Sequence, residues 1–116
     1  RRFPLFDPAD FHHSADDLRS NCEVSDYHDK HNVQFCDLSG MPDLCTECEH
    51  VQDTLAAYLN HMAQLGVAGV RIDSAKHQDV GDLGKVLSRV NSSLRVFQEV
   101  SDTQADAVDP MPYTSL

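Results

Sequence analysis

The second half of the chain carries the clearest pattern of apolar and polar positions. In residues 49–65, apolar side chains recur at helical spacing on one face, which predicts an amphipathic helix built on Val51, Leu55, Tyr58, Leu59, Met62 and Leu65. Gly66 follows, and glycine commonly ends a helix in the left-handed conformation. The apolar run at residues 67–72 then predicts a short buried strand, which is followed directly by Asp73.

A second helix and a second strand come next. In residues 79–91 the apolar positions repeat at i, i+3, i+4 and i+7, which predicts a helix with one apolar face: Leu83, Val86, Leu87 and Val90. Residues 94–100 are β-branched and aromatic, predict a strand, and carry Glu99 at its end. Strand, helix and strand in this order predict a right-handed βαβ unit with two parallel strands. We therefore expect Asp73 and Glu99 on the same rim of the sheet.

Two carboxylates on one rim have a chemical use. Neighbouring strands lie about 4.8 Å apart, and two carboxyl groups about 5 to 5.5 Å apart are the pair of a retaining glycosidase. Arg71 precedes Asp73 by two residues, so it lies on the same side of the strand and would keep that carboxylate ionised. The alternative is that Asp73 only caps the segment that follows.

Residues 1–50 show no sustained periodicity. They contain Pro4, Pro8 and Pro42 and many Asp, Asn and Ser residues, which predicts loops with a few short strands. A loop-rich region of this length is normally functional, disordered, or held by a metal or a disulfide. We therefore expect a division near residue 50, with an α/β part at residues 51–116.

Charge and size exclude some partners. The 116 residues carry a formal net charge of −10 and are 41% hydrophobic, which suits one small domain. The nine Lys and Arg residues are scattered, so nothing neutralises a run of phosphates, and we expect no nucleic-acid partner. No apolar run approaches the roughly 18 residues of a membrane helix, so we expect no membrane partner either.

Four cysteines indicate an oxidising compartment and allow three pairings. Cys45 and Cys48 form a C-x-x-C motif with His50 nearby, which would suit a redox pair or half a zinc site. A local disulfide or two free thiols is favoured, because the sequence has no second C-x-x-C motif. The other histidines of this half are expected on the surface rather than at a transition metal: His12, His13, His28 and His31.

Three short motifs, in the same order, resemble the α-amylase family of glycoside hydrolases. GVAGVRIDSAKH (66–77) resembles its nucleophile region, FQEV (97–100) its acid/base region, and MPDL (41–44) the end of its calcium-binding excursion. The segments 21–44 and 106–116 are also similar to animal- and bacterial-type members. The resemblance implies an α/β fold: part of a (β/α)₈ TIM barrel, about strands 4 and 5 with flanking helices, plus the calcium-binding excursion after strand 3 at residues 1–50. A closed barrel needs at least about 200 residues, so we interpret the chain as an internal fragment.

The resemblance implies endo-hydrolysis of α-1,4-glucosidic bonds in starch or glycogen. Asp73 would be the nucleophile, and Glu99 would protonate the leaving oxygen and then deprotonate water. Glu99 must begin protonated, so we expect its pKa to lie above that of Asp73, with desolvation supplied by apolar neighbours: Val96, Phe97 and Val100. The third family carboxylate falls outside this chain, so the isolated fragment is expected to be inactive.

Substrate-binding residues also follow from the resemblance. Lys76 and His77 resemble residues on the leaving-group side of the cleft, and Tyr27 matches an aromatic that lines it, although ordinary packing would also explain a tyrosine. Arg71 would orient the nucleophile. In animal-type members this arginine also ligates chloride, but the other chloride ligands fall outside this chain.

Calcium is the cofactor that the resemblance implies. Asp43 aligns with a carboxylate ligand and His77 with a residue that contributes its main-chain carbonyl, while an upstream Asn and further carbonyls would complete six to eight oxygens. A turn-forming Asp after Pro42 is the alternative. The resemblance also pairs Cys22 with Cys36 and implies a secreted, monomeric enzyme in its full-length form.

Three other functions stay open. A related transglycosylase would use the same acids, although the animal-type flanks favour hydrolysis. A non-catalytic amylase-like binding domain would have no need to keep Asp73, Glu99 and Arg71 together. A small metal module rich in cysteine and histidine would bind zinc rather than calcium.

Overall fold

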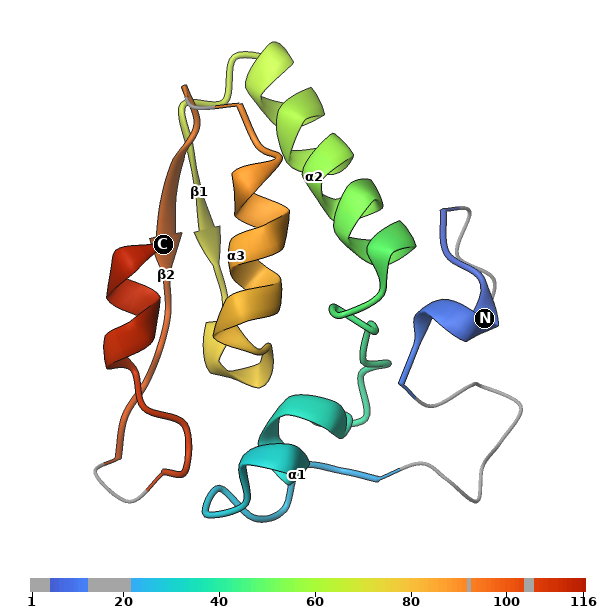
Figure 1. Cartoon of the computed structure of the whole chain (residues 1–116), viewed down its shortest axis with the longest axis vertical. Helices are drawn as coiled ribbons and strands as arrows, with labels where there is room; N and C mark the ends of the chain where they lie inside the picture. Colours follow the sequence, from blue (N-terminus) through green and yellow to red (C-terminus); the bar gives the residue numbers. More distant parts are fainter. Residues whose placement is uncertain (1–4, 13–21, 92, 104–105) are drawn as a thin grey trace.

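The computed structural model describes residues 5–12, 22–91, 93–103 and 106–116. Along these residues lie helices and strands in the order α1 (Lys30–Phe35), α2 (Glu49–Gln64), β1 (Gly69–Ile72), α3 (Val80–Ser88) and β2 (Arg95–Gln98). Short 3-10 turns accompany them: η1 (Pro8–Asp10), η2 (Ala75–His77) and η3 (Met111–Ser115). Figure 1 shows β1 and β2 side by side, α2 packed against α3, and α1 near η2, which follows β1.

The two strands pair in parallel, with Gly69 opposite Arg95 and Ile72 opposite Gln98. Because α3 connects them, β1, α3 and β2 form the βαβ unit that the sequence predicts. Each strand has only four residues, so both are shorter than the predicted segments 67–72 and 94–100.

The end of α2 explains the late start of β1. Gly66 has a left-handed φ of 93°, and its N–H donates to the Ala63 carbonyl at 3.0 Å. The N–H of Val67 donates to the Met62 carbonyl at 3.1 Å, which completes a Schellman motif. Val67, which the pattern assigns to the strand, is therefore still part of the hydrogen-bonded end of α2.

Helix α3 begins at a side-chain cap and buries its apolar stripe. The Asp79 carboxylate accepts a hydrogen bond of 2.9 Å from the N–H of Gly81. Leu83 and Val86 are buried, as the helical pattern predicts. The predicted range 79–91 is longer than α3 because it includes this cap and the turns that follow Ser88.

One hydrophobic cluster joins distant parts of the chain, and its buried members are Val33, Ala75, Leu83, Val108 and Tyr113. It places α1, η2, α3 and the C-terminal segment against one another. The Tyr113 hydroxyl donates to the Gln78 carbonyl at 2.5 Å and accepts from the Gln34 side chain at 3.3 Å. Burial, with the nearby charge of Asp79, raises the pKa of Tyr113 to about 12.

Helix α1 was not predicted. It begins where the Asp29 carboxylate accepts a hydrogen bond from the His31 N–H at 2.9 Å, and it buries Val33 and Gln34. Six residues are too few to show a helical period. The described remainder of residues 5–48 is irregular, with isolated bridges between Phe11 and Leu44, Glu23 and Asp37, and Leu38 and Met41. The division at residue 50 stays a prediction.

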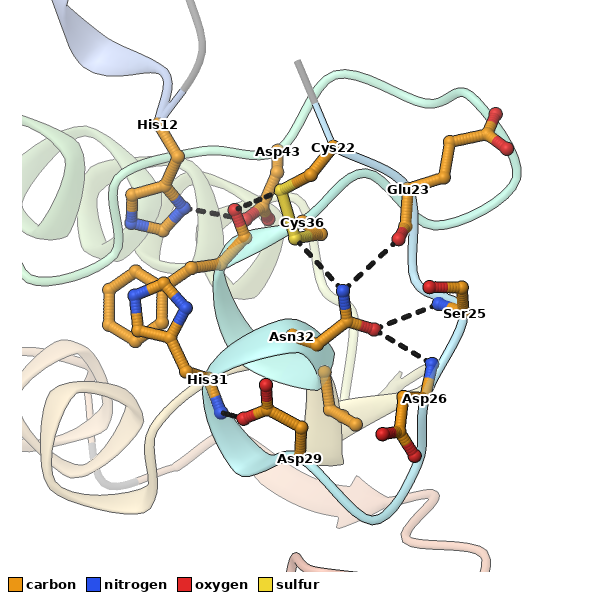
Figure 2. The surroundings of a disulfide bond; sticks show 12 residues. His12, Cys22, Glu23, Ser25, Asp26, Asp29, His31, Asn32, Cys36 and Asp43 are labelled. Atoms are coloured by element: carbon orange, nitrogen blue, oxygen red, sulfur yellow. Dashed lines mark hydrogen bonds and ion pairs between the residues drawn. A yellow bond between two sulfur atoms is a disulfide. The ribbon is translucent and has the colours of Figure 1, made fainter. Parts of the chain in front are cut away.

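Two disulfides hold this irregular part. Cys22 pairs with Cys36, as the resemblance implies, and Cys45 pairs with Cys48 in the local disulfide that was one of the favoured alternatives. Figure 2 shows Asn32 beside the first disulfide. Its side-chain oxygen accepts from the N–H groups of Ser25 and Asp26, and its amide donates to the Glu23 carbonyl and to the Cys36 sulfur.

Helix α2 is only partly covered. Val51 is fully buried, but Tyr58 and Leu65 of the predicted apolar face are exposed in this structure, as are Phe97 on β2 and Met111 in η3. In the part of the chain that the structure describes, every helix is too short or too polar to cross a lipid bilayer.

Candidate active site

The carboxyl ends of β1 and β2 carry Asp73 and Glu99, each one residue beyond its strand. Strand pairing continues past the last paired residues, because the Glu99 N–H donates to the Ile72 carbonyl at 2.9 Å. The Ala75 N–H in turn donates to the Glu99 carbonyl at 2.8 Å. Backbone hydrogen bonds therefore fix the two acids side by side on one rim, which the βαβ pattern predicts.

Arg71 bridges the two carboxylates. Its Nη2 atom lies 3.0 Å from Asp73 Oδ1 and 3.0 Å from Glu99 Oε1. The two carboxylates can be no farther apart than the sum of these two contacts, which is compatible with the roughly 5 to 5.5 Å spacing of a retaining glycosidase pair. All three side chains are open to solvent in this structure.

In this structure the pKa of Glu99 is lowered from its ordinary value, so the expected desolvation by apolar neighbours does not dominate. The Ser74 N–H donates to Glu99 Oε2 at 3.1 Å and is the largest cause that lowers the pKa of Glu99. A hydrogen bond with Asp73 and the charge of Arg71 lower it further, and burial opposes them only partly. Phe97, one of the residues expected to desolvate the acid, is 66% exposed.

Beside this rim lies an open pocket of about 430 Å³. Three of the residues predicted to bind substrate line it together: Tyr27, Lys76 and His77. The other lining residues are His28, Leu38, Ser74, Ser101, Thr103 and Asp106. Ser74 lines the pocket and also contacts the rim, because its N–H donates to Glu99. Its backbone adopts a left-handed φ of 47°.

Lys76 is held within the protein rather than left free for a ligand. Its ammonium lies 2.5 Å from Asp106 Oδ2, 3.1 Å from the Ser101 carbonyl, and 4.5 Å from the centre of the Tyr27 ring. Both partners of the ion pair are buried. The pKa of Asp106 is lowered, most strongly by the hydrogen bond from Lys76 and then by that from the Thr103 hydroxyl. The sequence did not reveal Asp106 as a partner, because 30 residues separate the two side chains.

His77 is oriented by the backbone of α1. Its Nδ1 atom lies 2.9 Å from the Val33 carbonyl, which fixes a proton on that nitrogen in the neutral ring. The ring meets the Tyr27 ring edge to face, at a centroid distance of 5.8 Å. Burial, with the charge of Lys76, lowers the pKa of His77.

Comparisons with known proteins agree on one family. The chain is 37% identical over 113 residues to an alpha-amylase of Tenebrio molitor, covering 88% of this chain and 24% of that protein. It is 44% identical over 90 residues to an alpha-amylase of Thermomonospora curvata, covering 78% and 15%. A crystal structure of a mutant alpha-amylase I from Eisenia fetida with maltohexaose superposes with a TM-score of 0.85 at 35% identity, over 96% of this chain and 24% of that one. The chain belongs to the α-amylase family.

The matches cover 15% to 24% of the length of these α-amylases. An alpha-amylase from Malbranchea cinnamomea matches with a TM-score of 0.63 at 23% identity, which supports the fold alone. A scan against models of protein families finds no match. The fold of the described residues is therefore that of part of an α-amylase, with a two-stranded parallel sheet and its helices.

Asp43, the predicted calcium ligand of the amylase family, lies next to a histidine. Its Oδ2 atom is 2.5 Å from His12 Nδ1, and a dashed line marks this contact in Figure 2. Its charge also acts on the ring of His77, the other predicted ligand residue. Carboxylate and carbonyl oxygens fit calcium in kind, but Asp43 and the His77 carbonyl are fewer than the six to eight oxygens that calcium needs. These two residues therefore do not complete a calcium site by themselves.

The prediction that the histidines lie on the surface is correct for two of them and wrong for His12. His28 and His31 are exposed, while the His12 side chain is only 9% exposed and also lies 2.8 Å from Glu47. His50 pairs with the buried Asp10 at 2.9 Å. The spacing of residues in the sequence does not predict the pairs His12–Glu47 and His50–Asp10. His13 lies outside the described residues.

Proposed function

We propose that this chain carries the nucleophile and the acid/base of a retaining α-amylase that cleaves α-1,4-glucosidic bonds inside starch or glycogen. The observation that carries the proposal is the rim itself. Asp73 and Glu99 follow adjacent parallel strands, and one guanidinium contacts both. Membership in the α-amylase family supports the reaction class, and the maltohexaose named with the Eisenia fetida enzyme supports an α-glucan as the substrate.

The reaction has two steps. Asp73 attacks the anomeric carbon while the glycosidic C–O bond breaks, and Glu99 gives its proton to the departing oxygen. Glu99 then removes a proton from water, and the resulting oxygen attacks the same carbon and releases Asp73. The Arg71 guanidinium, 3.0 Å from Asp73 Oδ1, would orient this carboxylate for attack.

Glu99 must gain a proton before the first step. The Ser74 N–H and the side chains of Asp73 and Arg71 now lower its pKa, and the rim is open to water. A bound glucan would displace that water, and the third family carboxylate would repel a second negative charge. Both effects raise the pKa of a carboxyl group.

The remaining assignments concern the larger enzyme. We assign β1 and β2 to about the fourth and fifth barrel strands, residues 1–50 to the excursion after strand 3, and calcium to Asp43 and the His77 carbonyl with ligands from elsewhere. Tyr27 and His77 would contact sugar, while Lys76 would shape the pocket wall. When bound, calcium would hold the excursion against the rim.

Secretion completes this proposal. Two disulfides within residues 22–48 fit an extracellular protein. The enzyme would act as a monomer, and this chain alone, with only two of the family's three acids, would be inactive.

The test is starch hydrolysis by the intact protein carrying Asp73→Asn or Glu99→Gln. Each change should reduce the rate at least about 10⁴-fold, because losing a nucleophile or its proton donor removes several kcal/mol of transition-state stabilisation. Asp53→Asn is the matched control, since Asp53 is also an exposed acid that pairs with an arginine, Arg89, but lies on α2.

Retained starch cleavage in Asp73→Asn would remove Asp73 from the role of nucleophile. Product analysis separates the related reaction: new, longer oligosaccharides in place of shorter ones would indicate a transglycosylase. An intact protein that binds starch but cleaves none would indicate a binding domain.

A further inference from the structure

A second cluster of reactive side chains lies away from the rim, at the start of α2. A ring nitrogen of His12, the Cys45 sulfur and a Glu47 carboxylate oxygen all lie within 4.8 Å of one another. Cys48 is bonded to Cys45 and is the N-cap residue of α2. Three side chains of the types that bind zinc therefore lie together, and a fourth, Cys48, is bonded to one of them.

Backbone hydrogen bonds bring the two parts of this cluster together. The His12 N–H donates to the Asp43 carbonyl at 3.0 Å, and the Cys45 N–H donates to the Asp10 carbonyl at 2.8 Å. The Cys48 N–H donates to the Cys45 carbonyl at 2.9 Å, so the C-x-x-C segment is a tight turn. The position of His12 beside the two cysteines therefore does not depend on the side chains alone.

His12 has the surroundings of a metal-bound histidine. One ring nitrogen faces Asp43 at 2.5 Å, while the other lies 2.8 Å from one Glu47 oxygen and 3.0 Å from its second. Ligating histidines commonly donate their second nitrogen to a carboxylate in this way, which fixes the ring and makes it a better ligand. In the disulfide form, however, the two sulfurs are bonded to each other and are not thiolates.

We propose that reduction of the Cys45–Cys48 disulfide turns this cluster into a tetrahedral site for a zinc-class divalent cation. The ligands are the Cys45 and Cys48 thiolates, the His12 Nε2 atom and the Glu47 carboxylate. A two-electron reductant, a dithiol or a phosphine, breaks the S–S bond and leaves two thiols. The cation then replaces the two thiol protons, which pass to solvent, and two metal–sulfur bonds form.

The required movements are small. Tetrahedral zinc at about 2.0 to 2.3 Å from its ligands separates the ligand atoms by about 3.3 to 3.8 Å, compared with the present limit of 4.8 Å among the ligand atoms of His12, Cys45 and Glu47. Glu47 is partly exposed, so its side chain can adjust. The N-terminus of the 16-residue helix α2 favours negative charge on the thiolates. Sulfur and nitrogen ligands select zinc over calcium.

The experiment uses the intact protein with and without phosphine treatment, and cobalt(II) as the probe. Thiolate-bound tetrahedral cobalt has strong visible bands and a near-ultraviolet charge-transfer band, and zinc should abolish them by displacement. We expect the bands only after reduction, with one cobalt per chain. Cys45→Ser/Cys48→Ser should lose them. Cys22→Ser/Cys36→Ser should keep them, which assigns the signal to the correct disulfide.

Two further variants test the other ligands. Glu47→Gln and His12→Asn should each weaken cobalt binding at least about tenfold, the size seen when even a supporting contact to a metal site is lost. Glu49→Gln and His31→Asn are the matched controls and should change the affinity less than about twofold. Both control residues are exposed, and Glu49 directly follows Cys48 in the sequence.

Reduced protein without tetrahedral bands would overturn the proposal. Bands that survive both Glu47→Gln and His12→Asn would overturn it too, because they would indicate two thiols binding metal adventitiously. Glu47 lies on the surface, and a circular dichroism spectrum of its variant confirms that folding is intact.

Discussion

At the residue scale, single contacts decide what the side chains of the rim can do. Arg71 holds Asp73 and Glu99 together, and the Ser74 N–H keeps the pKa of Glu99 low. The sequence predicts which acids share the rim, because strand ends follow from the pattern. It does not predict the pKa of Glu99, because that depends on the N–H of a left-handed residue and on how much water covers the rim.

The same limit applies to charged partners far apart in the sequence. The partner of Lys76 lies 30 residues away and that of His12 lies 31 residues away. Both pairs form because the C-terminal and N-terminal segments fold back onto the rest of the chain. A local sequence pattern does not predict such long-range contacts.

Tyr113 gives a residue-scale prediction. Its pKa is about 12 against the ordinary 10.0, so the folded state holds this proton more tightly than the unfolded state. The resulting stability is complete below about pH 10 and is lost as the pH rises toward 12. Tyrosinate absorbance should show a late step that Tyr113→Phe removes. Tyr58→Phe, which changes an exposed tyrosine, should leave the step in place.

At the element scale, long and strongly periodic segments are predicted well. The helix at residues 49–65 and the βαβ unit appear in the structure with small differences at their ends. Helix α1 was missed because a six-residue element is defined by its Asp29 cap and by packing on the cluster around Ala75, not by a pattern of its own. Strand β1 starts late because the N–H of Val67 closes the preceding helix.

The end of α2 gives a prediction at this scale. Gly66→Ala should destabilise the protein by about 1 to 2 kcal/mol, because a left-handed φ is costly with a Cβ atom. A Cβ at Gly66 would meet no atom within 4 Å, so the cost comes from the backbone alone. Urea unfolding measures it.

Gly84→Ala is the control for this change. Gly84 lies inside α3, where alanine is favoured by up to about 1 kcal/mol, and its Cβ would meet only the end of the Leu116 side chain. Gly66→Asn should reduce the free energy of unfolding less than Gly66→Ala, since asparagine tolerates this conformation better. Equal losses of unfolding free energy in Gly66→Ala and Gly84→Ala would contradict the assigned helix end.

At the scale of the whole molecule, buried contacts join distant segments while several apolar side chains remain open. Tyr58, Leu65, Phe97 and Met111 are all more than half exposed. The chain covers about a quarter of its α-amylase relatives, and we expect the rest of such a barrel to cover these side chains. The sequence predicted a buried strand at residues 67–72, but exposed and partly buried residues alternate along β1 in this structure.

The Lys76–Asp106 pair gives a prediction at this scale, because it ties η2 to the C-terminal segment. Lys76→Met should lower the thermal midpoint by about 4 °C or more, since it leaves a buried carboxylate without its positively charged partner. Lys85→Met, which removes a more exposed pair with Asp82, should change it little.

The effect of Lys76→Met should also depend on pH. Lys76 lowers the pKa of Asp106 from its ordinary 3.8, so the pair stabilises the folded state above about pH 4 and this stability is lost as the pH falls further. Thermal unfolding of both proteins over this range measures the difference, which should shrink in acid. A constant difference at every pH would contradict the ion pair as its source.

The most direct test of the central claim is to trap the covalent intermediate on the intact protein. A fluorinated α-glycosyl fluoride, which forms the glycosyl-enzyme quickly and releases it slowly, should add one sugar to the peptide that contains Asp73. Mass spectrometry of the digested protein locates the sugar, and Asp53→Asn should label as the unmodified protein does. A sugar on Asp73 is the result the account predicts, whereas an active enzyme labelled on another residue would contradict it.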